Sequence, residues 1–296
     1  MSDLPGLVAP GTVVVLNDTR VRKARLFGQT ATGRKVEVLL LNRRSAEIWE
    51  ALVGRAGKLR AGKPLGFAED VRGTIESVEA DVCLIRFHPA VDDPWLERNG
   101  HVPLPPYVRR PDAPSDEERY QTVYSRVIGS AAAPTAGLHF TDHMLKEMKD
   151  AGAQVCRVTL HVGLGTFLPI RSAQIEAHRM HEEIYSVPRE TKELVDAAVR
   201  ENRPILAVGT TVVRTLETAW TDEGLAAGGG STRIYITPGY RFKAVSQLFT
   251  NFHTPESSLL VLASAFAGRE LILQTYAEAI RKRYRFFSFG DAMLIR

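Results

Sequence analysis

The chain has 296 residues and a formal net charge of +4 at pH 7, and 44% of its residues are hydrophobic. This length and composition are typical of a globular protein with one large or two medium domains. The chain has no run of eighteen apolar residues and no basic start followed by an apolar core, which argues against a transmembrane helix and a secretory signal. Cys83 and Cys156 lie far apart in apolar runs, so we expect two buried thiols in a soluble, cytoplasmic protein that does not bind a membrane.

From residue 12 to residue 87 the chain consists of short runs rich in β-branched residues, separated by turns rich in glycine, lysine and arginine. No amphipathic segment of helix length interrupts these runs. The pattern indicates a small antiparallel barrel or sandwich. The expected strands are TVVVL, KVEVLLL, EIWEALV, GTIESV and DVCLIRF.

The segment 89–116 is rich in proline and is expected to be an extended linker. It is long enough for a binding role. Within it, the run PPY lies next to Arg109 and Arg110, an aromatic ring beside cations that could contact RNA.

After Asp116 the pattern changes to alternating helices and strands. Thr141 is placed to cap a helix that runs to about Asp150. This alternation predicts an α/β domain with a largely parallel sheet. The remaining elements expected in chain order are strand QVCRVTLHV, a short helix SAQIEAH, strand EEIYSV, helix ETKELVDAAVREN, strand PILAV, helix VVRTLETAW, a glycine-rich loop GLAAGGGST, strand RIYI and two C-terminal helices.

Two segments combine small residues with a histidine. Gly129–Thr141 is too rich in small residues for an ordinary strand or helix, and it contains His139. Leu160–Phe167 places His161 at the end of a β-like run, against a Gly-x-Gly turn. Small residues let a backbone approach a ligand closely, and histidine exchanges a proton near neutral pH. We therefore predict that these segments form two walls of one site.

The strand PILAV runs through Gly209, Thr210 and Thr211 into a helix. Backbone N–H groups and hydroxyls at a helix N-terminus suit an anion such as a carboxylate or a phosphate. Arg214 and Glu217 lie one turn further along the same helix, where they face the ligand or pair with each other.

The remaining candidates are polar residues in loops. His178-x-x-His181-Glu182 with His161 would suit a metal, but the spacing lacks a local ligand set, so we favour proton transfer or substrate binding and expect no metal. Asn251 and His253 could surround a planar base, or simply form a turn. Asp18 ends a strand beside Arg20, where an Asx-turn is the alternative.

Ten ordered motifs between Leu16 and Ile295 together resemble the S-adenosylmethionine:tRNA ribosyltransferase-isomerase family, and the resemblance extends from Asp3. Any one of them would be weak, whereas their order makes the match specific. The motifs are LNDTRV, LPPYVRR, ERYQTVYS, AAPTAGLHFT, VTLHVGLGTF, HRMHEE, AVGTTVVRTLE, PGYRF, TNFHTPESSLL and YRFFSFGDAMLI.

The resemblance implies a role in queuosine biosynthesis. The ribosyl group of S-adenosylmethionine would be transferred and isomerised onto 7-aminomethyl-7-deazaguanine at the tRNA wobble position, giving epoxyqueuosine in tRNA with release of adenine and methionine. The implied RNA substrates are the tRNAs for aspartate, asparagine, histidine and tyrosine, and we expect a monomer. The implied fold is an α/β domain with a smaller inserted β-barrel, divided here as 1–21 and 105–296 for the α/β domain and 22–104 for the barrel.

This chemistry needs groups that titrate near neutrality. The residues hypothesised to act in catalysis are His139, His161, His181, His253, Asp18 and Glu182. The residues hypothesised to bind the substrates are Asn17, Arg20, Arg109, Arg110, Pro134, Thr135, Gly137, Gly163, Gly165, Thr166, Gly209, Thr210, Thr211, Arg214 and Asn251.

One departure from the family pattern concerns the start of the chain. Family members usually carry a further N-terminal segment of several dozen residues before the Asp-Leu-Pro that is here Asp3-Leu4-Pro5, and this segment is expected to supply part of the α/β domain. One alternative to an active transferase is therefore a tRNA-binding short form with impaired catalysis. The other alternative is a metal-dependent hydrolase that uses His161, His178 and His181.

Overall fold

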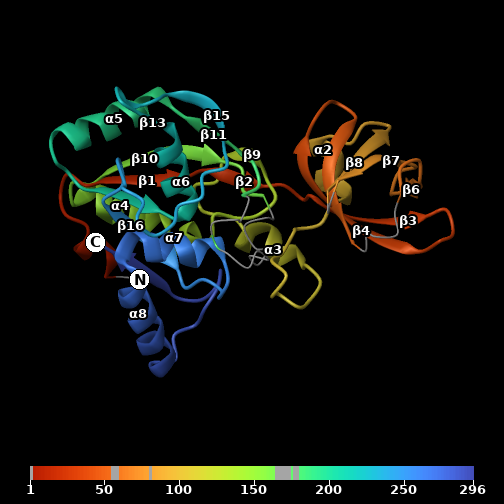
Figure 1. The fold of residues 1–296 in the computed structure, drawn as a ribbon. Helices are drawn as coiled ribbons and strands as arrows, with labels where there is room; N and C mark the ends of the chain where they lie inside the picture. The colour runs from red at the N-terminus through yellow and green to blue at the C-terminus, as the bar shows by residue number, and fades with distance from the viewer. Residues whose placement is uncertain (1–2, 55–59, 80–81, 164–174, 176–179) are drawn as a thin grey trace. The chain divides into compact units, whose positions relative to one another are not determined.

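The structure is a computed structural model that describes residues 3–54, 60–79, 82–163, 175 and 180–296 (Figure 1). The chain forms two compact units. One unit contains a mixed sheet with helices on both faces, and the other contains a closed β-barrel. The first unit comprises Met1–Arg20, Gln121–Val127 and Ala133–Arg296, and the second comprises Val21–Tyr120 and Ile128–Ala132.

The first unit is organised around a seven-stranded sheet in the order β15-β11-β10-β1-β12-β16-β17. The central strands β10, β1, β12 and β16 are parallel, and the strands outside them are antiparallel. The predicted α/β domain with a largely parallel sheet is therefore confirmed. The strands are β1 (Val13–Asn17), β10 (Gln154–Leu160), β11 (Glu183–Val187), β12 (Ile205–Val208), β15 (Gly228–Thr232), β16 (Gln247–Asn251) and β17 (Ala292–Ile295).

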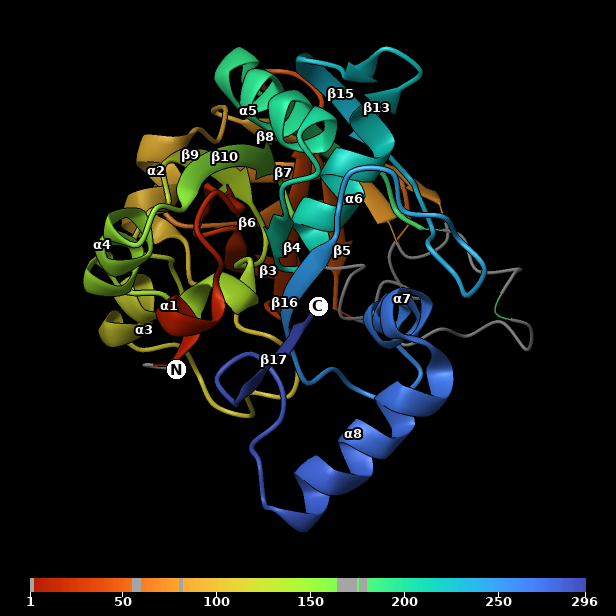
Figure 2. The same cartoon turned by 90° about the vertical axis from the view of Figure 1, so that its left-hand side faces the viewer.

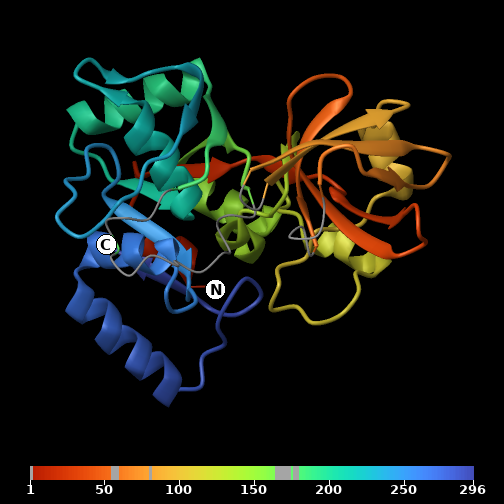
Figure 3. The same ribbon diagram turned by 45° about the vertical axis from the view of Figure 1, so that its right-hand side comes forward.

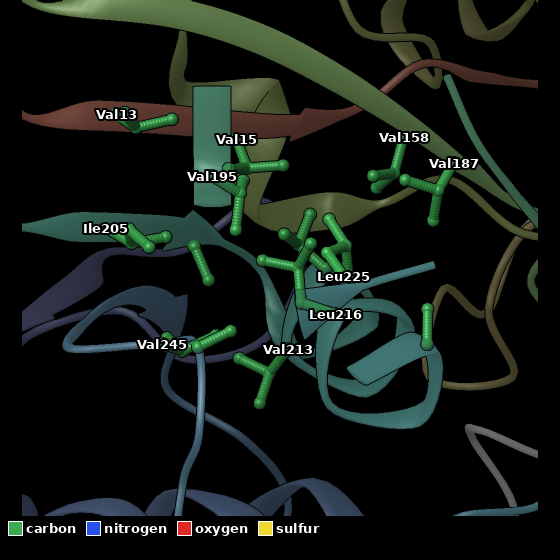
Figure 4. Close-up of a cluster of buried hydrophobic side chains, with 14 of the residues drawn as sticks. Val13, Val15, Val158, Val187, Val195, Ile205, Val213, Leu216, Leu225 and Val245 are labelled. Atoms are coloured by element: carbon green, nitrogen blue, oxygen red, sulfur yellow. The ribbon is translucent and has the colours of Figure 1, made fainter. Parts of the chain in front are cut away.

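Alternation along β1 divides the core of this unit into two layers. Val13 and Val15 face α5 and α6, whereas Val14 and Leu16 belong to the cluster that contains α1 and α4. Figure 2 shows these helix pairs on opposite sides of the strands, and Figure 4 shows the first layer, with Leu216 of α6 among the valines. The run TVVVL was expected among the barrel strands, but it forms β1 in the middle of the seven-stranded sheet. Every residue of β1 is buried, so its sequence does not alternate between polar and apolar residues.

Five helices of this unit follow the expected helical runs, and the short helix expected at SAQIEAH lies, except for Ile175, outside the described residues. The side chain of Thr141 accepts a hydrogen bond from the backbone N–H of Met144, as a helix cap should. No single helix in the described part of the chain is long and apolar enough to cross a membrane; α7 and α8 reach that length only together, with a bend of 113° between them. The helices are α1 (Leu4–Leu7), the 3₁₀-helix η2 (Thr135–His139), α4 (Asp142–Asp150), α5 (Arg189–Arg200), α6 (Thr210–Ala219), α7 (Ser258–Ala267) and α8 (Arg269–Arg281).

The strand expected at RIYI is wrong, because the strand is formed instead by the glycine-rich segment Gly228–Thr232, which is β15. This segment pairs with β11, and Gly230 lies opposite Tyr185. A Cβ atom on Gly230 would lie 2.6 Å from the hydroxyl of Tyr185, so the tyrosine ring occupies the space of the missing side chain. A short hairpin of β13 (Trp220–Thr221) and β14 (Gly224–Leu225) precedes it.

The second unit is a closed barrel in the order β3-β4-β5-β8-β7-β6, which confirms the predicted barrel (Figure 3). Neighbouring strands are antiparallel, and the inward-facing side chains form one apolar core that includes Trp49 and Phe87. The strands are β3 (Arg25–Thr30), β4 (Lys35–Arg43), β5 (Ile48–Val53), β6 (Pro64–Gly66), β7 (Arg72–Glu79) and β8 (Val82–His88). Strands β2 (Thr19–Val21) and β9 (Val127–Ser130) pair where the chain passes between the units.

The expectation of an extended linker over 89–116 is wrong, since α2 (Asp93–Asn99) and α3 (Pro114–Arg119) both lie within or at the end of this segment. The prolines stand in the first turn of each helix, where a missing N–H costs nothing. Asp92 caps α2 by accepting from the N–H of Trp95. The sequence therefore contains the N-cap and the first-turn proline of α2, although the whole segment is rich in proline.

Both thiols are buried, as predicted. Cys83 belongs to the barrel core and Cys156 to the first layer of the sheet. Burial raises the pKa of both thiols, that of Cys156 to about 12, so both stay protonated and act as small apolar side chains.

The carboxylate of Glu217 on α6 is buried and binds the segment that leads into β16. It accepts hydrogen bonds from the backbone N–H groups of Lys243, Ala244 and Val245 and from the hydroxyl of Tyr240, at 2.9–3.1 Å. Burial and this neighbouring carboxylate raise the pKa of Tyr240 to about 12, so the phenol remains a donor.

We expect Glu217→Gln to lower the free energy of unfolding by about 2–4 kcal/mol, because the amide offers one acceptor oxygen to several buried N–H groups. Urea denaturation would measure the loss. The control is Glu193→Gln on α5, whose carboxylate forms only an exposed ion pair with Arg189; it should change stability by less than about 1 kcal/mol. Equal effects of the two substitutions would contradict the structural role of Glu217.

Candidate active site

The carboxyl ends of the four parallel strands meet at one edge of the sheet. They are Asn17 on β1, Leu160 on β10, Val208 on β12 and Asn251 on β16. In open α/β sheets, ligands bind outside the carboxyl ends of the strands. Most of the residues predicted for the site in this unit lie at this edge.

A small pocket opens at this edge. It contains seven predicted site residues, which come from three separate segments of the sequence. Its lining residues are Ala133, Pro134, Thr135, Ala136, Val162, Gly209, Thr210, Thr211, Thr250, Asn251, His253 and Leu259.

The side chain of Asn17 joins three elements below the pocket. Its Nδ2 donates to the carbonyl oxygen of Leu160 at 3.0 Å and to Thr211 Oγ1 at 3.2 Å. Its Oδ1 accepts from the N–H groups of Leu160 and Thr19. Asn17 has no exposed surface, so its amide positions β10 and the start of α6 and is not placed to contact a substrate.

Asp18 is also buried, and both of its carboxylate oxygens have partners. Oδ1 accepts from Thr159 Oγ1 at 2.6 Å, and Oδ2 accepts from the guanidinium of Arg126 at 2.9 Å. The carbonyl oxygen of Asp18 also accepts from the N–H of Arg126. The carboxylate therefore holds the segment around Arg126 against the end of β1.

His161 follows β10 directly and contacts Thr19. Its Nδ1 lies 2.8 Å from Thr19 Oγ1, and its backbone N–H donates to the carbonyl oxygen of Ile184 on β11. The ring and the backbone are thus held from two sides. Sequence analysis did not identify Thr19 as a site residue, although it lies in the same motif as Asn17 and Asp18.

The amide of Asn251 determines which nitrogen of His139 carries the proton. Asn251 Nδ2 lies 2.8 Å from His139 Nε2 and 3.3 Å from the carbonyl oxygen of Phe287, and Oδ1 lies 3.2 Å from Thr135 Oγ1. A carbonyl oxygen only accepts, so Nδ2 faces Phe287 and also donates to His139. His139 Nε2 is then an acceptor and Nδ1 carries the proton. Burial lowers the pKa of His139, which favours this neutral ring at pH 7.

His253 is a second neutral imidazole, more deeply buried. Its Nε2 lies 2.8 Å from Thr250 Oγ1, and its backbone N–H donates to the hydroxyl of Tyr276 at 2.7 Å. Burial lowers the pKa of His253 to about 4. The ring lines the pocket but is uncharged over the physiological pH range.

The start of α6 forms the floor of the pocket. Gly209 has φ +92°, which a residue with a side chain rarely adopts, and its N–H donates to the carbonyl oxygen of Phe249 on β16. Strand β12 thereby turns into the helix at once. The first N–H groups of α6, at Thr210 and Thr211, lie at the pocket and carry the positive end of the helix dipole.

Arg214 and Glu217 do not pair with each other. Arg214 Nη1 forms a buried ion pair with Glu183 Oε2, while Oε1 of Glu183 accepts from the N–H of Gly163 at 3.0 Å. Arg214 Nη2 is buried without a hydrogen-bond partner among the residues described. The pair therefore connects α6, β11 and the segment after His161. Sequence analysis selected Glu182, whereas its neighbour Glu183 is the carboxylate that forms this buried ion pair.

Gly137 serves close packing in η2. A Cβ atom there would lie 2.0 Å from the hydroxyl of Tyr124, so no side chain fits without moving the ring. Burial strongly raises the pKa of Tyr124, which keeps its hydroxyl protonated. Gly137 therefore lets η2 approach Tyr124 closely and is not itself among the residues that line the pocket.

Several predicted residues lie away from the pocket. His181 is exposed, and Glu182 accepts from Ser231 Oγ on β15 and lies 3.6 Å from Arg233. Gly165, Thr166 and His178 fall outside the described residues. Within the part of the chain that is described, no group of three His, Cys, Asp or Glu residues could hold a metal ion.

The predicted RNA contacts differ in their surroundings. Arg20 and Arg109 are exposed, and Arg20 has one long hydrogen bond to Ser125. Arg110 is already engaged, because its guanidinium forms two hydrogen bonds with the buried carboxylate of Asp116 at 2.6 and 2.7 Å. The Arg110 guanidinium holds the pKa of Asp116 below its usual value.

The chain is similar to known proteins over nearly its whole length. The family model described as "Queuosine biosynthesis protein" matches residues 1–295. S-adenosylmethionine:tRNA ribosyltransferase-isomerase of Moorella thermoacetica is 50% identical over 99% of this chain and 87% of its own length. The enzyme of the same name from Treponema denticola is 45% identical over the same shares.

A solved structure gives the same result. The crystal structure of S-adenosylmethionine tRNA ribosyltransferase from Thermotoga maritima has a TM-score of 0.53 and 34% sequence identity, and the match covers 99% of this chain and 86% of that chain. The fold, the motifs at the carboxyl edge of the sheet and these matches agree. The chain belongs to the S-adenosylmethionine:tRNA ribosyltransferase-isomerase family of queuosine biosynthesis proteins.

Proposed function

We propose that this chain transfers and isomerises the ribosyl group of S-adenosylmethionine onto 7-aminomethyl-7-deazaguanine at the wobble position of tRNA. The products are epoxyqueuosine in tRNA, adenine and methionine. The observation that carries the proposal is the carboxyl edge of the sheet, where the neutral imidazole of His139 and the ring of His161 lie on segments adjoining the positive end of α6. Family membership supplies the substrate class.

The reaction needs proton transfers near neutral pH. A carbon next to a sulfonium is acidified, so a base can remove a proton from the ribosyl C5′. The aminomethyl group of the tRNA base must be uncharged to attack, and adenine must leave with a proton on its ring. We assign these transfers to His139 and His161, because each ring is held by a hydrogen bond to a neutral side chain at the carboxyl edge of the sheet.

The other residues position these groups or bind the substrates. The N–H groups of Thr210 and Thr211 would bind the methionine carboxylate at the start of α6. Asn17 and Asp18 act as positioning residues, because their polar atoms are occupied within the protein. We retain Arg20 and Arg109, which are exposed, as proposed contacts to tRNA phosphates.

The test of the proposal is adenine release, followed by chromatography, from S-adenosylmethionine mixed with an anticodon stem-loop that carries 7-aminomethyl-7-deazaguanine. An unmodified stem-loop is the control. We expect adenine only with the modified loop, together with a gain in RNA mass. Adenine release without a mass gain would indicate hydrolysis of the donor, and no release from either RNA would overturn the proposal.

We expect His139→Gln to lower the rate of adenine release by about 10²–10⁴-fold, since glutamine can form hydrogen bonds but cannot exchange a proton at neutral pH. Binding of S-adenosylmethionine, measured by calorimetry, should change much less. The matched control is His143→Gln, whose side chain is 80% exposed on α4. A variant H139Q with the turnover of H143Q would remove His139 from the reaction.

His253 should affect stability in acid. Its pKa of about 4 in the folded chain lies below its ordinary value of 6.5, so the unfolded chain alone binds a proton between these values. The folded state should thus lose up to about 3 kcal/mol as the pH falls from 6.5 to 4, with no penalty above 6.5. Denaturation at several pH values should show a shallower dependence for H253Q. An unchanged slope would mean that the ring is protonated in the folded chain.

The ion pair of Glu183 and Arg214 should control the position of the His161–Gly163 segment. In Glu183→Gln the charge of Arg214 loses its partner, which we expect to lower stability by about 3–5 kcal/mol and kcat by more than tenfold at a temperature where the variant is folded. KM for S-adenosylmethionine and kcat are measured separately. If Glu182→Gln loses kcat and Glu183→Gln does not, the carboxylate identified from the sequence is the functional one.

A further inference from the structure

A hollow of about 430 Å³ lies on the surface of the barrel. Its lining comes from the turn between β3 and β4, the end of β5 and the start of β6. These elements are distant in sequence but adjacent in the barrel, since β3 pairs with both β4 and β6. The lining residues are Thr30, Ala31, Thr32, Arg34, Lys35, Val36, Glu37, Gly54, Lys63 and Pro64.

The charges around this hollow are unbalanced. Arg34, Lys35 and Lys63 are exposed, and none of them forms an ion pair with a residue that the structure describes. The acidic residue of the lining, Glu37, pairs with Arg25 at 2.8 Å and so does not offset these charges. The hollow therefore carries three uncompensated positive charges.

Several other cations of the same unit are compensated. Arg86 pairs with Glu47 and Glu76, and Arg98 pairs with Glu69. The basic residues between positions 22 and 25 are likewise engaged, because Arg22 contacts Asp93, Lys23 contacts Glu97 and Glu117, and Arg25 contacts Glu37. Arg43, Arg60 and Arg72 of this unit also form no ion pair with a described residue, so the hollow is distinguished by three such cations in one lining.

Hydroxyl groups accompany the cations. Thr30 Oγ1 lies 3.0 Å from Thr32 Oγ1 and accepts from the N–H of Arg34. Lysine, arginine and threonine side chains are the usual donors to the phosphate oxygens of nucleic acids. Because the cations are exposed, a single phosphate would compete poorly with water and salt, whereas a polyanion with regularly spaced phosphates can engage all three at once and release their counterions.

We propose that the hollow on the barrel binds the phosphate backbone of the RNA substrate. The proposal rests on the proposed function in that the partner is tRNA. The contact is independent of base sequence, because the cations and hydroxyls suit phosphate oxygens. It adds affinity for the RNA and takes no part in the chemistry.

The experiment measures binding of an unmodified tRNA at several salt concentrations, by fluorescence anisotropy with the full chain. In Arg34→Ala/Lys35→Ala/Lys63→Ala we expect Kd to rise at least tenfold at low salt and the slope of log Kd against log salt to fall by about 2–3, near 0.9 for each lost contact. Binding of S-adenosylmethionine and kcat at saturating RNA should stay unchanged. Inorganic phosphate at millimolar concentration should not displace the RNA.

The matched control removes three exposed cations elsewhere, with Arg72→Ala, Lys149→Ala and Arg200→Ala combined. The two variants have the same net charge, so an equal loss of affinity would show general electrostatic attraction and overturn the proposal. An unchanged slope in the first variant would do the same. Since binding needs no turnover, a wild-type chain that binds tRNA but releases no adenine would overturn the proposed function alone.

Discussion

The parallel alignment of β10, β1, β12 and β16 places four strand ends together, and the amide of Asn17 locks that alignment. An amide has both an acceptor and donors, so one side chain satisfies the backbone of Leu160 in both directions and also reaches Thr211 at the start of α6. A carboxylate of the same shape could only accept, and it would bring a charge into a site with no exposed surface. The edge of the sheet is therefore specified by hydrogen-bonding chemistry as well as by apolar packing.

Burial at this edge favours the neutral form of its histidines. Removing an imidazole from water disfavours the charged form, so the pKa values of His139 and His253 are both lowered. The two rings nevertheless differ in their partners. His139 accepts a hydrogen bond from Asn251, and Nδ1 carries its proton, whereas His253 is held by Thr250 and Tyr276. The same burial therefore keeps both rings neutral, and their hydrogen-bond partners distinguish them.

Much of the fold could be predicted from local patterns, because β-branched runs, the Thr141 cap and the strand-to-helix turn at Gly209 act over a few residues. The glycine-rich strand β15 could not, since it depends on Tyr185 of another strand filling the space above Gly230. The site shows the same limit. Several of its residues were identified, but the partner of Arg214 on α6 is Glu183 on strand β11, 31 positions away. In β11 the glutamate is buried and Ile184 is exposed, so the sequence does not show which side of the strand faces inward.

The number of basic residues in a segment does not give the net charge that the segment presents to a ligand. The basic cluster at residues 22–25 is prominent in the sequence, yet its members contact carboxylates supplied by α2, α3 and β4, so little net charge is left there. At the other end of the chain, Arg281 and Lys282 share Glu278, and Arg285 faces Asp291. Arg34 and Lys35 are less conspicuous, but closure of the barrel brings Lys63 to the same hollow while Arg25 removes the charge of Glu37. Attraction for a polyanion follows from cations that the fold leaves uncompensated, and which cations these are depends on pairing between residues far apart in sequence.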